Sequence, residues 1–213
     1  MKLAIIGANG KIGSRITAEA LNRGHSVTGI SRNPDQSLSD NRVKWVQADA
    51  LNNSLLVSII QGHDAVISAF GVDWSKPETF HLFSDISSSL IIAAKQAGVQ
   101  RVINVGGAGS LEIVPGVQLV DTEAFPAEWK AGADEQRKSQ EIFRNEKELE
   151  WTFFSPAIII EPGPRSGKFR LGKDNPVFDE NGNSKISFDD YAVALIDELE
   201  KPQFIRQRFT IGY

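Results

Sequence analysis

The chain has 213 residues, a formal net charge of −4 and no cysteine. A chain of this length can bury a sizeable core without cross-links, and the lack of cysteine excludes disulfides and thiolate metal sites. Lysine and arginine are scattered among acidic residues, so they form no basic stripe for a nucleic-acid backbone, and no nucleic-acid partner is expected.

The chain opens at Met1 directly into an apolar strand, and no apolar run approaches the roughly 18 residues of a membrane span. We therefore expect no cleavable leader, no membrane partner and a cytoplasmic location. No linker-like stretch divides the sequence, so residues 1–213 are expected to form one domain. The histidines show no metal-ligand spacing and no metal site is expected; they are His25, His63 and His81.

Short apolar runs alternate with segments of helical period along the chain. This pattern is typical of a parallel sheet covered by helices on both faces. We predict an α/β fold, a Rossmann-type doubly wound parallel sheet with about seven strands and helices on both faces. The predicted strands are Leu3–Ile6, Ser26–Ile30, Val43–Gln47, Ala65–Ser68, Val102–Val105, Trp151–Phe154 and Arg208–Ile211.

Three helices have a visible buried face. The first is predicted over Lys11–Arg23 and ends at Gly24, where a left-handed residue is favoured. A second, long helix in the middle of the chain stops before Gly98, and a third begins at a capping box of Ser187 and Asp190. The inward residues of the three are Ile12, Ile16 and Ala20; Phe80, Phe83, Ser87, Leu90 and Ala94; and Ala192, Leu195, Ile196 and Leu199.

Glycine and proline are frequent in residues 158–185, which are too long for a plain connector. We expect a small C-terminal substrate or lid region around residues 157–186.

A glycine-rich turn joins the first strand to the first helix, with the spacing Gly-x-x-Gly-x-x-Gly. Gly7 permits the sharp turn, Gly10 lets the backbone approach phosphates, and Gly13 lets the helix pack close to the sheet. The helix then directs unpaired N–H groups at a pyrophosphate. The turn therefore predicts a dinucleotide site, and a Rossmann-like turn that has lost its ligand is the alternative.

The end of the second strand indicates which dinucleotide binds. NAD-selective chains usually end this strand with an acid, but here it ends in Ser31 and Arg32, with no acid before Asp35. An arginine can bind a 2′-phosphate, so we predict NADPH over NADH, with NADH still possible. The alternative is that Arg32 stacks on adenine or points to solvent.

Other candidate contacts lie where parallel strands end, because ligands bind along that edge of the sheet. Asp49 follows the third strand and can accept from an adenine amino group or, as an alternative, cap the next helix. The full set of expected cofactor contacts is Gly7, Asn9, Gly10, Lys11, Ile12, Gly13, Ser31, Arg32, Asp49, Ala50, Ser68, Ala69, Phe70, Gly71, Pro156 and Ala157.

Five segments together resemble an atypical branch of the short-chain dehydrogenase/reductase superfamily, the NADH-flavin reductase-like proteins related to biliverdin reductase B and NmrA-like proteins. The resemblance extends over the whole chain and implies a nicotinamide dinucleotide and an aromatic, flavin-like acceptor. The family's name suggests NADH, which conflicts with the argument from Arg32. The segments are Met1–Gly13 (MKLAIIGANGKIG), Gly62–Gly71 (GHDAVISAFG), Asn104–Ser110 (NVGGAGS), Trp151–Ala157 (WTFFSPA) and Ile186–Ala194 (ISFDDYAVA).

The catalytic pair of the superfamily, a tyrosine with a lysine four residues later, is missing. Tyr191 and Tyr213 lack such a lysine, and Glu128–Gln140 contains no tyrosine. Carbonyl reduction by that route is therefore hard to support. By resemblance, Ser110 lies where the family often has a hydroxyl near the nicotinamide, which makes it the candidate catalytic residue; capping a turn is the alternative.

Hydride transfer to a flavin needs no strong protein acid, because the ring delocalises charge and water can supply the proton. We predict an NAD(P)H-dependent oxidoreductase that reduces flavin, as a substrate rather than a prosthetic group, or a similar conjugated acceptor. The alternatives are a non-catalytic NADPH sensor with a regulatory protein partner and, ranked last, a sugar-nucleotide epimerase; a homodimer is possible. The expected substrate contacts, each with core or lid packing as its alternative, are Trp74, Phe125, Trp129 and Ile158.

Overall fold

The computed structural model describes residues 1–34 and 42–213. Within them, the main sheet has eight strands in the order β10-β12-β8-β5-β4-β1-β2-β3, and only the β10–β12 pair is antiparallel. The strands of this sheet are β1 (Lys2–Ile6), β2 (Ser26–Ser31), β3 (Val43–Gln47), β4 (Ala65–Ser68), β5 (Arg101–Val105), β8 (Glu150–Ser155), β10 (Arg170–Gly172) and β12 (Gln207–Gly212).

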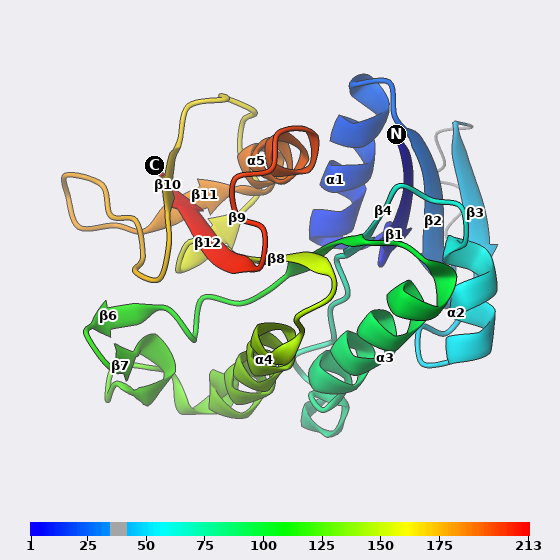
Figure 1. Cartoon of the computed structure of the whole chain (residues 1–213). Helices are drawn as coiled ribbons and strands as arrows, with labels where there is room; N and C mark the ends of the chain where they lie inside the picture. Colours follow the sequence, from blue (N-terminus) through cyan, green and yellow to red (C-terminus); the bar gives the residue numbers. More distant parts are fainter. Residues whose placement is uncertain (35–41) are drawn as a thin grey trace.

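Helices cover both faces of the sheet, as Figure 1 shows. Helices α1 and α5 pack on one face, and α2, α3 and α4 pack on the other. The predicted doubly wound Rossmann-type α/β fold is therefore confirmed. In the described residues the helices are α1 (Lys11–Asn22), α2 (Asn53–Ile60), α3 (Leu82–Ala97), α4 (Ala127–Asn145) and α5 (Phe188–Glu200), with short 3-10 turns at Pro77–Thr79 and Leu119–Asp121.

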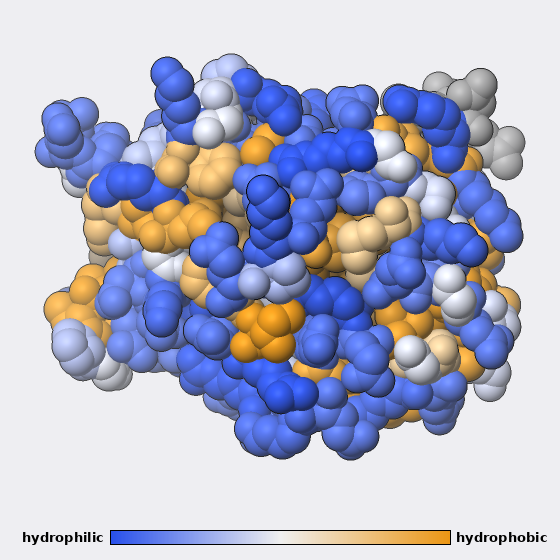
Figure 2. Space-filling model, turned by 45° about the horizontal axis from the view of Figure 1, so that its top comes forward, coloured by the Kyte–Doolittle hydropathy of each residue, from blue (hydrophilic) through white to orange (hydrophobic). Residues whose placement is uncertain are grey.

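Apolar side chains are concentrated in the two layers between the sheet and its helices. On α1, Ile16 and Ala20 are fully buried and Ile12 is half-buried, which agrees with the predicted inward row. Gly24 follows this helix with φ of +82°, a value that favours glycine and sharply turns the chain towards β2. Figure 2 shows one face of the molecule, where hydrophilic residues predominate and hydrophobic ones gather in smaller patches.

The structure contains elements that the sequence pattern did not predict. Helices α2 and α4 were missed, and β10 adds an eighth strand to the sheet from within residues 158–185. Phe80, placed on the middle helix by its spacing, lies before α3, although its ring is buried. Helix α4 was missed because its buried face is made largely of small and polar residues: Gly132, Ala133, Ser139, Gln140 and Phe143.

The predicted capping box at the start of α5 is half right. The Ser187 hydroxyl accepts a hydrogen bond from the Asp190 backbone N–H at 2.9 Å, as expected. The Asp190 carboxylate, however, does not return to Ser187, because it accepts from the Ser166 hydroxyl (2.5 Å), the Gly167 N–H (2.7 Å) and the Tyr213 hydroxyl (2.9 Å). This buried carboxylate therefore links α5, the segment at Ser166 and the C-terminal residue Tyr213.

Residues 157–186, predicted to be a lid, are attached to the body of the protein. Arg165 forms an ion pair with Glu19 of α1 at 2.8 Å, and the Ser187 hydroxyl donates to the carbonyl of Pro164. Two strands, β9 from this segment and β11 at its end, form a small parallel sheet. A separate two-stranded hairpin, outside this segment, precedes α4. These strands are β9 (Ile159–Glu161) with β11 (Lys185–Ser187), and β6 (Glu112–Val114) with β7 (Val117–Gln118).

Candidate functional site

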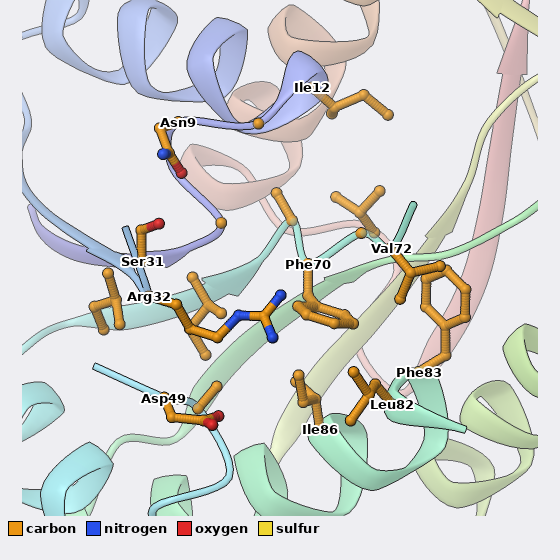
Figure 3. Close-up of a pocket in the computed structure, with 18 of the residues that line it drawn as sticks. Asn9, Ile12, Ser31, Arg32, Asp49, Phe70, Val72, Leu82, Phe83 and Ile86 are labelled. Carbon is orange, nitrogen blue, oxygen red and sulfur yellow. The ribbon is translucent and has the colours of Figure 1, made fainter. Parts of the chain in front are cut away.

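The strand order reverses at β1, because the chain proceeds to β2 on one side of it and returns to β4 on the other. Ligands of open α/β sheets bind in the crevice beyond the carboxyl ends of the strands at such a point. A pocket of about 580 Å³ lies there (Figure 3). It is lined by residues at the ends of all five strands from β1 to β5 and by side chains of α3 and α4.

The glycine turn after β1 depends on its first and last glycines for folding. Gly7 has φ of +74°, and a Cβ there would lie 2.6 Å from the carbonyl oxygen of Ala69. A Cβ on Gly13 would lie only 2.0 Å from the carbonyl oxygen of Gly7. A side chain at Gly7 would collide with the backbone after β4, and one at Gly13 would push α1 away from the end of β1, so the role of both glycines is internal to the protein.

Gly10 differs, because the protein's own packing does not require it. Its φ is −74°, and a Cβ there would meet only the Gly7 carbonyl oxygen, at 3.2 Å. It is the N-cap of α1 and provides no side-chain cap, and Gly10, Lys11 and Ile12 line the pocket, so the uncapped first turn of the helix borders the pocket. Such a helix end stabilises a bound anion, and these residues fit a pyrophosphate.

Side chains after β1 and β2 meet on one side of the pocket. The Asn9 amide donates to the Asn33 carbonyl at 2.9 Å, and Ser31 accepts from the Asn33 N–H at 3.3 Å. Arg32 is exposed and extends over the pocket towards Phe70 (Figure 3). Residues 30–34 contain no acid, and Asp35 lies outside the described residues. The charge at this end of the pocket therefore suits a phosphate.

Asp49 lies on the pocket wall beside Ala50, as expected. The alternative, that it caps the following helix, is wrong. Its carboxylate accepts from the Leu51 N–H at 3.0 Å and closes a local turn, whereas the N-cap of α2 is Asn52, which accepts from the Leu55 N–H. The oxygen of Asp49 that is not used in this turn remains available to a ligand.

The other end of the pocket is aromatic. The ring centroids of Phe70 and Phe83 are 6.0 Å apart at nearly a right angle, and the Trp74 ring lies 6.2 Å from Phe83. Trp74 also packs on α4, because a Cβ on Gly132 would meet its ring at 2.5 Å. These rings form an apolar wall beside the end of β4, where a planar ligand can stack.

Several predicted contacts lie away from this pocket. Gly13 packs against the backbone of Gly7 and Ala8, and Ser68 lines a small adjoining cavity. Trp129 was placed in a loop but lies in the first turn of α4, where it is 52% exposed. The other predicted contacts that are not among the described lining residues are Phe125, Pro156, Ala157 and Ile158. Residues 157–186 contribute nothing to the pocket, and their role in acceptor binding stays a prediction.

Ser110, the candidate catalytic residue, is buried and does not line the pocket. Its hydroxyl accepts from the Arg208 guanidinium at 3.1 Å, and its carbonyl accepts from the same nitrogen at 2.7 Å. The guanidinium also binds Asp174 at 2.5 Å. Through this network Ser110 is a structural partner of Arg208. The sequence did not predict this pairing, because β12, which carries Arg208, is far from Ser110 along the chain.

Both tyrosines are engaged outside the pocket. Tyr191 is fully buried, stacks on Phe154 with ring centroids 4.0 Å apart and donates to the Phe154 carbonyl at 2.6 Å. Burial raises the pKa of the Tyr191 hydroxyl well above its usual range. Tyr213 donates to Asp190. Neither hydroxyl is positioned to protonate a ligand in the pocket.

Sequence analysis missed part of the pocket wall. The polar residues that it missed are Asn33 after β2 and Gln136 of α4. No local motif marks Gln136, because α4 itself has no recognisable apolar period. The available signal for Gln136 was its position four residues after Gly132, because residues at this spacing lie on one face of a helix. The other lining residues that it missed are Ile6, Ile30, Ala48, Leu51, Val72, Leu82, Phe83, Ile86, Val105 and Gly106.

The fold and the glycine turn define a nucleotide-binding protein of the Rossmann class. A sequence model of NAD(P)H-binding proteins matches residues 7–202. The chain therefore belongs to this NAD(P)H-binding family.

Three solved structures of similar sequence cover this whole chain. A protein of Burkholderia pseudomallei assigned as an exported protein is 45% identical, is covered over its full length and superposes with a TM-score of 0.90. A protein of Bacteroides thetaiotaomicron assigned as an epimerase is 42% identical over 96% of its chain, with a TM-score of 0.91. A protein of Streptococcus pneumoniae assigned as an NADH-flavin reductase is 38% identical over 99% of its chain, with a TM-score of 0.88.

These similar proteins carry different assignments, so their names do not decide the activity or the location of this one. Among residues 1–34 and 42–213, no helix has the length and apolar character needed to cross a bilayer. The cytoplasmic location stays a prediction, because one of the similar proteins is assigned as exported.

Proposed function

We propose that this protein is an NAD(P)H-dependent oxidoreductase that reduces a flavin or a similar conjugated ring, with the flavin as a substrate. The observation that carries the proposal is one continuous pocket, which connects the glycine turn and Arg32 with the aromatic wall of Phe70, Trp74 and Phe83. Membership of the NAD(P)H-binding family and the likeness to a protein assigned as an NADH-flavin reductase support it.

The residues present fit a nicotinamide dinucleotide, which supplies a hydride when bound. The N-terminus of α1 at Gly10 would hold the pyrophosphate, and Arg32 with Ser31 would hold a 2′-phosphate. Each charge-assisted hydrogen bond contributes about 1.5–3 kcal/mol, so NADPH is the expected cofactor.

The aromatic wall has two tasks in this proposal. It orients a planar acceptor by stacking, and it excludes water from the space between the acceptor and the cofactor. No protein acid is assigned, because both tyrosine hydroxyls are bound elsewhere and water can supply the proton to a reduced flavin.

Steady-state oxidation of NADPH and NADH with FMN tests the proposal. We expect NADPH to be preferred, and Arg32→Ala to reduce that preference about 10–100-fold, as the loss of one charge-assisted contact implies. Arg15→Ala is the matched control, since Arg15 is an exposed arginine of α1 outside the pocket. Undetectable turnover with a range of flavins and quinones would contradict the proposed activity.

The engagement of both tyrosines favours one alternative, a non-catalytic NADPH sensor. A sensor binds NADPH without turnover and captures a regulatory protein partner. Equilibrium titration of NADPH beside the turnover assay separates the two functions, because only the sensor combines tight binding with an absent reaction.

A further inference from the structure

Gln136 is a polar side chain in an otherwise apolar part of the pocket. Beyond the end of β4, the other described lining residues are apolar, aromatic or glycine. The remaining polar lining side chains come from the ends of β1, β2 and β3, on the side of Arg32; they are Asn9, Lys11, Ser31, Arg32, Asn33 and Asp49.

Close packing holds the Gln136 amide at this place. A Cβ on Gly107 would lie 1.9 Å from the Gln136 Oε1, so the amide rests directly on the backbone of the loop after β5. Four residues earlier, Gly132 receives the Trp74 ring in the same way. Gln136 therefore lies on the same face of α4 as Gly132, on which Trp74 packs. This face of α4 borders the pocket.

The amide is left with hydrogen-bonding capacity. Its donor and acceptor groups make no hydrogen bond to any other described residue, and its side chain is only half-buried. A glutamine amide offers two N–H donors and a carbonyl acceptor. In an aromatic pocket these groups are free to bind water or a polar edge of a ligand.

The position along the sheet indicates which part of a ligand Gln136 meets. Arg32 follows β2, and Gln136 packs on the loop after β5, which is three strands away. With neighbouring strands about 4.8 Å apart, this is a separation of about 14 Å across the sheet. A dinucleotide with its adenosine end at Arg32 directs its nicotinamide towards β4 and β5, so Gln136 lies at the acceptor's end.

We propose that Gln136 selects the acceptor by hydrogen bonding to a ring edge that presents a carbonyl next to an N–H, as an imide or a lactam does. The inference rests on the proposed function and adds a residue that determines specificity. An amide pairs with such an edge by donating to its carbonyl and accepting from its N–H, whereas a quinone edge has no donor to offer. The ring itself is held by Phe70, Trp74 and Phe83.

Lumiflavin and 3-methyllumiflavin test this selection, because they differ only at the imide N–H. We expect the parent protein to prefer lumiflavin by on the order of tenfold in kcat/KM, through KM, as one or two neutral hydrogen bonds imply. Gln136→Met keeps helix propensity and approximate size, and we expect it to remove the preference without changing the Kd of NADPH. Gln96→Met, the same change at an exposed position of α3 outside the pocket, should keep the preference.

Three results would overturn the inference. These are equal use of both flavins by the parent, a preference that persists in Gln136→Met, and a loss of NADPH affinity in Gln136→Met as large as the loss of lumiflavin affinity. Fluorescence titration of both flavins with NADP⁺ present separates this failure from that of the proposed function. Selective flavin binding without NADPH oxidation contradicts the reaction but keeps the role of Gln136, whereas unselective binding removes that role.

Discussion

We expect Gly13→Ala mainly to lower the stability of the fold and Gly10→Ala mainly to weaken NADPH binding, although both change the same turn by one methyl group. The methyl of Gly13→Ala would lie 2.0 Å from the Gly7 carbonyl oxygen, whereas that of Gly10→Ala would lie 3.2 Å from it. The first distance forces α1 to move by about 1 Å or more, because contacts under 3.0 Å essentially never occur. The second requires an adjustment of a few tenths of an ångström.

These distances convert into different free energies of unfolding. Overpacking costs typically about 1–3 kcal/mol or more, and we expect Gly13→Ala to lose at least this much stability. Gly10 is an N-cap without a side-chain bond, so alanine there should cost about 1 kcal/mol or less. Gly10 lines the pocket at the N-terminus of α1, so a methyl there should crowd a phosphate bound at this end of the helix, and we expect the Kd of NADPH to rise at least tenfold, about 1.4 kcal/mol.

Two measurements check this pair of variants. Urea unfolding followed by circular dichroism gives the free energy of unfolding, and titration of NADPH fluorescence gives the Kd. A folded Gly10→Ala that binds NADPH as tightly as the parent would refute the placement of the pyrophosphate at this turn. A Gly13→Ala as stable as the parent would refute the packing argument.

Three further predictions concern groups outside the pocket. Hydrogen bonds from Arg165 and Arg23 hold the pKa of the Glu19 carboxyl below its usual value of 4.5, so its contribution to stability is present above that pH and lost as pH falls through the lower folded pKa. The free energy of unfolding, measured by urea titration, should therefore fall less between about pH 5 and pH 3 in Glu19→Gln than in the parent. An equal fall in the two proteins would contradict this. Glu198→Gln leaves the buried Arg101, 2.9 Å away, without its counter-charge and should cost about 3–5 kcal/mol in the same assay, with a loss under about 1 kcal/mol as the refuting result. Tyr191→Phe removes a buried hydrogen bond to the Phe154 carbonyl and should cost about 1–3 kcal/mol with kcat unchanged; a fall in kcat without a loss of stability would instead make Tyr191 catalytic.

Local patterns in the sequence were sufficient for most of the fold. The strands have continuous apolar runs because both faces of the sheet are covered, and α1 and α5 have clear apolar rows. The glycine spacing after β1 pointed to the place where the structure has its pocket, since the turn, the close approach and the start of α1 all depend on neighbouring residues. Helix α4 escaped because its buried face lacks large apolar side chains.

The composition of the pocket wall was decided only by tertiary structure. The sequence made Ser110 a candidate catalytic residue, but Arg208, 98 residues later, donates to its hydroxyl. Gln136 was not predicted, and it lines the pocket because α4 packs its amide on Gly107 after β5. Periodicity and spacing report which face of an element is buried, and they act within a few residues. Which side chains from distant elements meet depends on packing between layers, and this is why the sequence alone indicated the place of the pocket but not all of the residues that line it.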